Sequence, residues 1–284
     1  MKIVITLLLC SSTFIVKSQD ALETFNETRI LNAHSNETLK KKILQFRIEH
    51  RFGDMAGSAG GAQEFFGFDN AADIRFAFEY GVTDKLMIGL GRSKGTGAPY
   101  RSLVDGFVKY KVLEQNKAKQ IPVGVSLFGA STITYMKANE DLSLVQSFPK
   151  FSHRMTYVSQ AIISRKFNDR FSMAILPTYV HRNLVLANDI KGLFSCGAAI
   201  SLKITKGFGI LGEYFYNFHD NEIRTEFKNS LSAGLEWLTN GHNFKLVITN
   251  AKGFNEVQYI AGNTSDWSKG QFRLGFSISR NFKL

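Results

Sequence analysis

Apolar and polar residues alternate with a period of two along most of this chain. In residues 43–52, ILQFRIEHRF, large apolar side chains occupy the even positions, apart from His50, and the odd positions from 45 onward are polar. Residues 73–80 and 272–279 repeat the pattern, and Phe215 breaks it in a similar stretch. Because successive side chains of a strand point to opposite faces, each stretch predicts a β-strand with one apolar and one polar face.

This alternation predicts twelve strands. The predicted strands lie near residues 42–52, 70–80, 85–93, 102–113, 121–136, 150–165, 171–182, 192–205, 208–218, 228–238, 243–250 and 270–283. Long and short connections alternate between them, and the series starts and ends with a long one. Both chain ends then fall on the short-turn side, as in outer-membrane barrels with short periplasmic turns and longer outer loops.

We therefore expect an all-β fold, a closed antiparallel up-and-down transmembrane β-barrel of about 12 strands, with a short N-terminal periplasmic or plug segment. A soluble sandwich also shows alternation, but the loop rhythm and the even strand count favour the barrel. Closure is required because no water pairs with backbone groups in the bilayer core. The barrel would turn Phe46 and Phe76 outward and Arg75 inward. Pro177 cannot donate a ladder hydrogen bond, so we expect a β-bulge there.

The first residues have the features of a targeting segment. Residues 1–18, MKIVITLLLCSSTFIVKS, combine an early lysine, an apolar stretch and a small final residue, which is typical of a signal peptide. A buried N-terminal strand or helix is the alternative. We expect residues 19–41 to form an N-terminal plug or periplasmic segment and residues 42–284 the outer-membrane barrel. Without the signal peptide the chain keeps Cys196 alone, which excludes an intramolecular disulfide.

Composition excludes several classes of protein. The chain is 44% hydrophobic and 13% aromatic with 4 Pro, which excludes a disordered chain. No apolar run after the signal peptide approaches the roughly 20 residues of a transmembrane helix. The net charge is +11, yet there is no recognition helix or clustered basic stripe, so we expect no nucleic-acid partner. Basic residues could contact anionic lipopolysaccharide or bias the lumen toward anions, or simply form an ordinary surface.

Several segments carry a resemblance to one family. They are TFNETRILNAHSNETL at 24–39, FRIEHRFG at 46–53, FFGFDNAADIR at 65–75, EYGVTD at 79–84, LGRS at 90–93 and DGFVKYK at 105–111. Together they resemble the uncharacterised membrane-bound β-barrel domain family, a domain of unknown function, of the Bacteroidetes outer membrane. The resemblance implies location in the bacterial cell outer membrane and implies no reaction. The amphipathic last strand is similar to the insertion signal read by the outer-membrane assembly machinery, which makes that machinery an expected partner.

If the apolar rows face lipid, a set of charged residues points into the lumen. The candidate lumen-lining residues are Arg47, Glu49, Arg51, Asp73, Arg75, Glu79, Asp105, Lys109 and Lys203. One interpretation is a polar conduit or binding wall. The other is a self-neutralising ladder that fills the barrel, because buried mixed charges must pair to be tolerated.

Other candidate chemistry is weaker. The oxygens of Asp69, Asn70 and Asp73 lack the full calcium-loop pattern and suit a turn cap better. The glycine-rich run at 53–61 precedes no helix, which favours a flexible loop over a phosphate cradle. His153 and His181 lie near hydroxyl or amide residues but in no nucleophile motif. We expect no enzymatic activity, no cofactor and no metal site.

Two functions remain open. The first is a narrow channel or transport barrel with a polar, charged lumen, since twelve strands lie between the filled eight-stranded and the open sixteen-stranded barrels. The alternative is a non-conducting structural or docking barrel for a periplasmic partner, and an outer-membrane enzyme is less favoured. Expected partners are outer-membrane lipid and lipopolysaccharide, and the solute is not predicted.

Overall fold

Twelve antiparallel strands form where the alternation predicts them. The computed structural model describes residues 21–284 apart from 71–72, 96, 188 and 220–222, so the signal peptide predicted at 1–18 lies outside the described residues. The strands are β1 (Ile43–Arg51), β2 (Asp73–Gly81), β3 (Leu86–Lys94), β4 (Ser102–Leu113), β5 (Gly124–Thr134), β6 (Met155–Lys166), β7 (Phe171–Arg182), β8 (Gly192–Lys203), β9 (Phe208–Phe218), β10 (Ser230–Leu238), β11 (His242–Thr249) and β12 (Arg273–Lys283).

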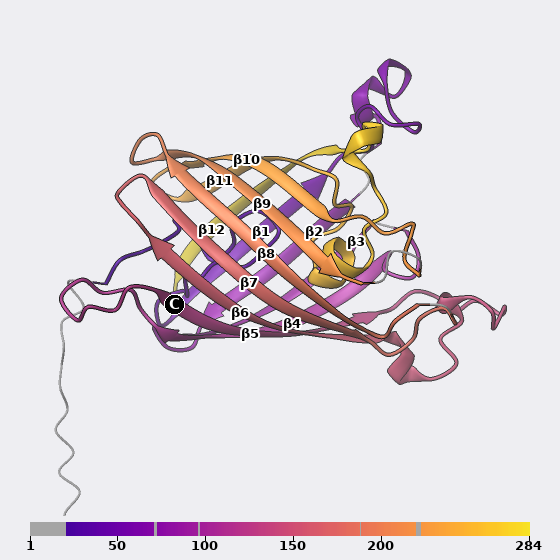
Figure 1. Cartoon of the computed structure of the whole chain (residues 1–284), viewed down its shortest axis with the longest axis horizontal. Coiled ribbons are helices and arrows are strands. Elements are labelled where there is room, and N and C mark those ends of the chain that lie inside the picture. The colour runs from indigo at the N-terminus through magenta and orange to yellow at the C-terminus, as the bar shows by residue number, and fades with distance from the viewer. Residues whose placement is uncertain (1–20, 71–72, 96, 188, 220–222) are drawn as a thin grey trace, which may run out of the picture.

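The strands close into one barrel. Each strand pairs with its neighbours in the chain, and β1 also pairs with β12, so the sheet has no edge. Figure 1 shows the long connections gathered at one end of the barrel and the short turns at the other, together with the C-terminus. The predicted closed twelve-stranded fold is confirmed.

The two faces of the wall differ in polarity. Outward side chains such as Phe78 and Tyr214 are 54% and 40% exposed, whereas the inward Arg75 is 0% exposed. The apolar rows therefore face outward and the charged rows face the interior, as the barrel interpretation requires. Within the described residues, no helix is long and apolar enough to cross a membrane.

The expected bulge at Pro177 is wrong. On either side of it Gln160 pairs with Thr178 and Ile163 with Ile175, so the register of β6 against β7 does not change. Pro177 also keeps its place opposite Cys196 in β8. The strand tolerates the missing N–H donor without inserting a residue, and a register shift lies instead in β4, between Lys111 and Leu113.

Five short helices lie in the described parts of the connections. They are η1 (Ala62–Gly67), η2 (Val145–Ser147), η3 (Phe151–Arg154), η4 (Val257–Ala261) and η5 (Trp267–Lys269). Of these, η4 is buried along its whole length. It packs with interior side chains of the barrel, including Phe215 and Val247, in one apolar cluster. The long connection between β11 and β12, predicted as an outer loop, thus turns into the barrel because its apolar residues find cover there.

Candidate functional site

A ladder of paired charges lines one side of the barrel interior. The antiparallel register sets Arg51 opposite Asp73 and Glu49 opposite Arg75. The Arg75 guanidinium lies 2.7 Å from a Glu49 oxygen and 2.6 Å from an Asp105 oxygen, joining three strands. These pairs are buried, and each charge has an opposite charge beside it, which is the condition for tolerating ions away from bulk water.

The N-terminal segment, residues 21–41, enters this interior from the short-turn end. Its backbone is tied to the β4–β5 turn by the bond from the Leu22 N–H to the Gln115 carbonyl. It then folds into a tight hairpin, because the Ile30 N–H donates to Ala33 and the Ser35 N–H donates to Thr28. The hairpin, residues 24–36, touches side chains of strands all around the barrel, so it lies in the lumen.

Two charged residues of the hairpin bind the wall directly. Glu27 lies 3.0 Å from Arg47 and 2.6 Å from Lys245, and so bridges β1 and β11. Arg29 lies 2.9 Å from Glu49. The wall ladder is therefore not complete by itself, since the hairpin supplies partners for its charges.

Hydrogen bonds between wall side chains and the hairpin backbone complete the hold on the hairpin. The Glu213 carboxylate accepts the backbone N–H groups of residues 31–33, at 3.0 Å from the Ala33 nitrogen. Lys109 donates to the carbonyls of Thr28 and Ser35, both at 3.0 Å. The tip of the hairpin is thus fixed by hydrogen bonds to charged groups, which are stronger than neutral ones.

The electrostatics keep the hairpin charged at Glu27 and neutral at His34. Burial alone would raise the pKa of Glu27, but Arg47 and Lys245 overcome this and lower it to about 2. Burial, together with the cations Arg29 and Lys109, holds the pKa of His34 well below its usual range. The neutral imidazole packs beside Phe128, with ring centroids 4.3 Å apart. Glu27 is therefore an ionic anchor and His34 an apolar one.

A second segment fills the lumen from the long-loop end. Residues 251–261 turn inward, and Tyr259 packs edge-on against Phe215 with ring centroids 5.2 Å apart. The two segments meet where Arg29 donates to the Phe254 carbonyl at 3.2 Å. The barrel interior is therefore occupied from both ends.

The structure places the predicted lumen residues as follows. Arg47, Glu49, Arg51, Asp73, Arg75, Glu79, Asp105 and Lys109 are buried inside the barrel. Lys203 belongs to the inward row of β8 but is half-buried, because it lies at the strand's end beside the short turn.

Sequence reasoning missed Glu27 and Arg29, which lie in a segment without periodicity. It also missed Lys245, which the alternation of Phe244, Leu246 and Ile248 could have placed inside.

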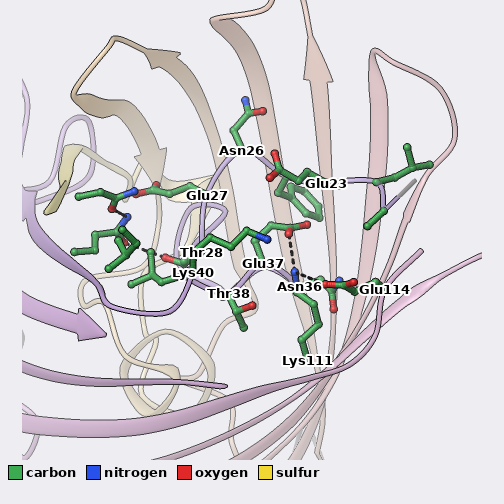
Figure 2. A pocket seen from close by; sticks show the side chains of 17 residues that line it. Glu23, Asn26, Glu27, Thr28, Asn36, Glu37, Thr38, Lys40, Lys111 and Glu114 are labelled. Carbon is green, nitrogen blue, oxygen red and sulfur yellow. Dashed lines mark hydrogen bonds and ion pairs between the residues drawn. The ribbon is translucent and has the colours of Figure 1, made fainter. Parts of the chain in front are cut away.

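The hairpin leaves a cavity of about 310 Å³ at the short-turn end. Figure 2 shows Glu37, Lys111 and Glu114 together on one side of it, where the Lys111 ammonium lies 3.1 Å from Glu37 and 3.7 Å from Glu114. Parts of the N-terminal segment, such as Glu23 and Lys40, are exposed to solvent at this end. In the part of the chain described, no three His, Cys, Asp or Glu side chains lie close enough to hold a metal ion.

Comparison with solved structures shows the same architecture. The KdgM porin in complex with disordered oligogalacturonate matches with a TM-score of 0.51 at 9% identity, over 84% of this chain and 99% of that chain. The KdgM porin alone matches with a TM-score of 0.50 at 7% identity, over the same shares. At such identities the likeness concerns the fold. No curated protein matches this sequence.

The family comparison spans almost the whole barrel. A family model described as "Membrane bound beta barrel domain (DUF5777)" matches residues 25–282, which includes the lumenal hairpin from residue 25 and all twelve strands except the last residue of β12. The protein is thus a membrane-bound β-barrel with the fold of outer-membrane porins. The chain belongs to the DUF5777 membrane-bound β-barrel family.

Proposed function

We propose that the protein is a porin-like channel of the bacterial outer membrane, closed in this structure by its own N-terminal hairpin. The observation that carries the proposal is the way in which the hairpin is bound. Polar contacts such as Glu27–Arg47 and Arg29–Glu49 hold it to a charged wall. Water and ions can replace such partners, which offsets part of the cost of releasing the hairpin, while its buried Phe25, Ile30 and Leu31 oppose release.

The lumen behind the hairpin suits passage of a polar solute. Its wall carries alternating acids and bases such as Glu49, Arg75 and Asp105, which remain paired across the strands without help from the hairpin. The similar KdgM porin has been solved in complex with oligogalacturonate, which supports a conduit in this architecture. The proposal assigns no reaction to the chain.

A reversible lock tests the proposal. Thr24 in the hairpin segment and Ser164 in β6 have hydroxyl oxygens 3.2 Å apart, so Thr24→Cys with Ser164→Cys places two sulfurs within disulfide reach. The background carries Cys196→Ser. We expect conductance in planar bilayers under reducing conditions and none after oxidation, and the two single-cysteine variants should not respond to oxidation.

The competing function is a non-conducting docking barrel. The observation in its favour is that both segments fill the lumen and meet at Arg29 and Phe254. Absence of conductance in the reduced double variant, with native barrel migration on gels, would refute the channel and favour docking. Equal conductance in the oxidised and reduced forms would refute the closing role of the hairpin.

A further inference from the structure

A second cavity, of about 290 Å³, lies at the long-loop end of the barrel. Five of the six long connections contribute to it. They supply Tyr100, Val145, Asp189, Phe227 and Thr264, in chain order. Gly262 and Thr264 belong to the connection that turns into the lumen, so the cavity sits directly over the inner segment. A ligand arriving from the long-loop side meets this cavity before it meets the lumen.

The cavity combines apolar walls with positive charge. Its apolar walls include Pro99, Val145, Leu184, Leu186 and Phe227. Arg182 and Lys252 also line it, and among the described lining residues Asp189 is the only carboxylate. Small-molecule sites have this character, with mostly apolar walls and a few polar groups that fix orientation.

Arg182 of this cavity shares its carboxylate partner with a second arginine, Arg224, which is not among the described lining residues. The Asp189 carboxylate lies 2.8 Å from an Arg182 nitrogen and 3.2 Å from an Arg224 nitrogen, so one anion serves two guanidinium groups. The two side chains are only 4% and 1% exposed. Burial and the nearby Arg182 lower the pKa of Arg224 to about 10. The cluster therefore holds an excess of buried positive charge.

Two buried donors in the cluster also lack acceptors. Among the described residues, the Nε atoms of Arg182 and Arg224 have no hydrogen-bond partner. A buried donor without an acceptor costs free energy, and more when it is charged. An added anion at this point would supply the missing acceptor and balance the charge.

We propose that this cavity binds a small amphipathic anion, with a carboxylate directed to the arginine cluster and an apolar body against Val145 and Phe227. Arginine donates paired N–H groups to carboxylates, which gives both strength and orientation. Lys252 adds a second cation at the wall. The site goes beyond the channel proposal, because binding here requires no passage through the lumen.

Titration calorimetry of the full chain in detergent tests the site, with 3-phenylpropionate and its neutral counterpart 3-phenylpropanol as probes. We expect saturable one-to-one binding of the acid. The alcohol should bind roughly tenfold more weakly, because it cannot form the charge-assisted pair. Equal affinities for acid and alcohol, or no binding of the acid above the detergent blank, would overturn the proposal.

One substitution separates a binding role of the site from a structural one. Asp189→Asn removes the resident carboxylate and should tighten binding of the acid roughly tenfold, because both arginines then lack their anion. A purely structural Asp189 would instead give weaker binding or none. Unchanged or weaker binding by a variant with native barrel migration would contradict the proposal.

Matched lysine variants provide a second readout that keeps the native Asp189. Lys252→Gln should weaken binding of the acid about threefold, which is typical of a partly exposed ion pair. Lys137 is an exposed residue in the β5–β6 connection that does not line the cavity, so Lys137→Gln should leave binding of the acid unchanged. If both variants behave alike, the charge of this cavity does not select the ligand and the proposal fails. None of these measurements uses current, so they stand apart from the test of the channel.

Discussion

Replacing Glu27 by Gln should release the hairpin from the lumen. The carboxylate lies 3.0 Å from Arg47 and 2.6 Å from Lys245, and removing one partner of a buried ion pair costs about 3–5 kcal/mol. Part of this is recovered, since Glu79 lies 3.3 Å from Arg47 and Glu236 lies 3.5 Å from Lys245. We therefore expect a loss of about 3 kcal/mol, which is on the order of a 100-fold rise in the open population.

The assay is the rate of maleimide labelling at Ser35→Cys in a Cys196→Ser background. Ser35 is 0% exposed, so its thiol reacts only when the hairpin moves. Glu27→Gln should raise the labelling rate on the order of 100-fold. Glu23→Gln is the control, because Glu23 is an exposed residue of the same segment. A rise below about threefold, or the same rise with Glu23→Gln, would refute the ionic anchor.

Three further predictions concern stability and pH. Phe215→Ala should lower the free energy of unfolding by about 3–5 kcal/mol in urea titrations, because Phe215 is buried against Tyr259. Phe218→Ala should lower it far less, since Phe218 is 56% exposed, and equal losses from the two variants would contradict this reasoning. Gly81→Ala should destabilise the barrel, since a Cβ would lie 2.1 Å from the Lys40 carbonyl oxygen, whereas Gly241→Ala meets nothing within 4 Å and should leave the urea midpoint unchanged. Because the pKa of Glu27 falls from 4.5 to about 2, its contribution to hairpin binding is complete above pH 4.5 and is lost as the pH falls toward 2. The labelling rate of Ser35→Cys, divided by that of the same thiol in the urea-unfolded chain at each pH, should therefore stay constant from pH 7 to 4.5. A rise of this ratio in that window would show another controlling group.

Period-two alternation predicts the wall of the barrel because each strand has a lipid side and a lumen side. It places Arg47 and Arg75 correctly in the interior from local pattern alone. The hairpin is different, because Glu27 and Arg29 take their positions from partners far away in the chain. No local periodicity reports such contacts.

The inward turn of residues 251–261 left one trace in the sequence. Phe215 occupies a position in β9 where the alternation requires a small or polar residue, and in the structure it covers Tyr259. An aromatic residue in a polar row therefore indicates apolar material inside the barrel. The pattern could not identify that material, because Tyr259 lies in a connection and any of the long connections could have supplied it.

The position of the hairpin at the start of the chain bears on how the molecule matures. Its contacts include Glu213, Ser232, Lys245 and Ser279, which belong to the last four strands to be synthesised. The hairpin, although it lies early in the chain, therefore has no complete binding site until β12 meets β1. Final docking of the hairpin is thus coupled to the seam between these two strands, and a docked hairpin marks a barrel that has finished closing.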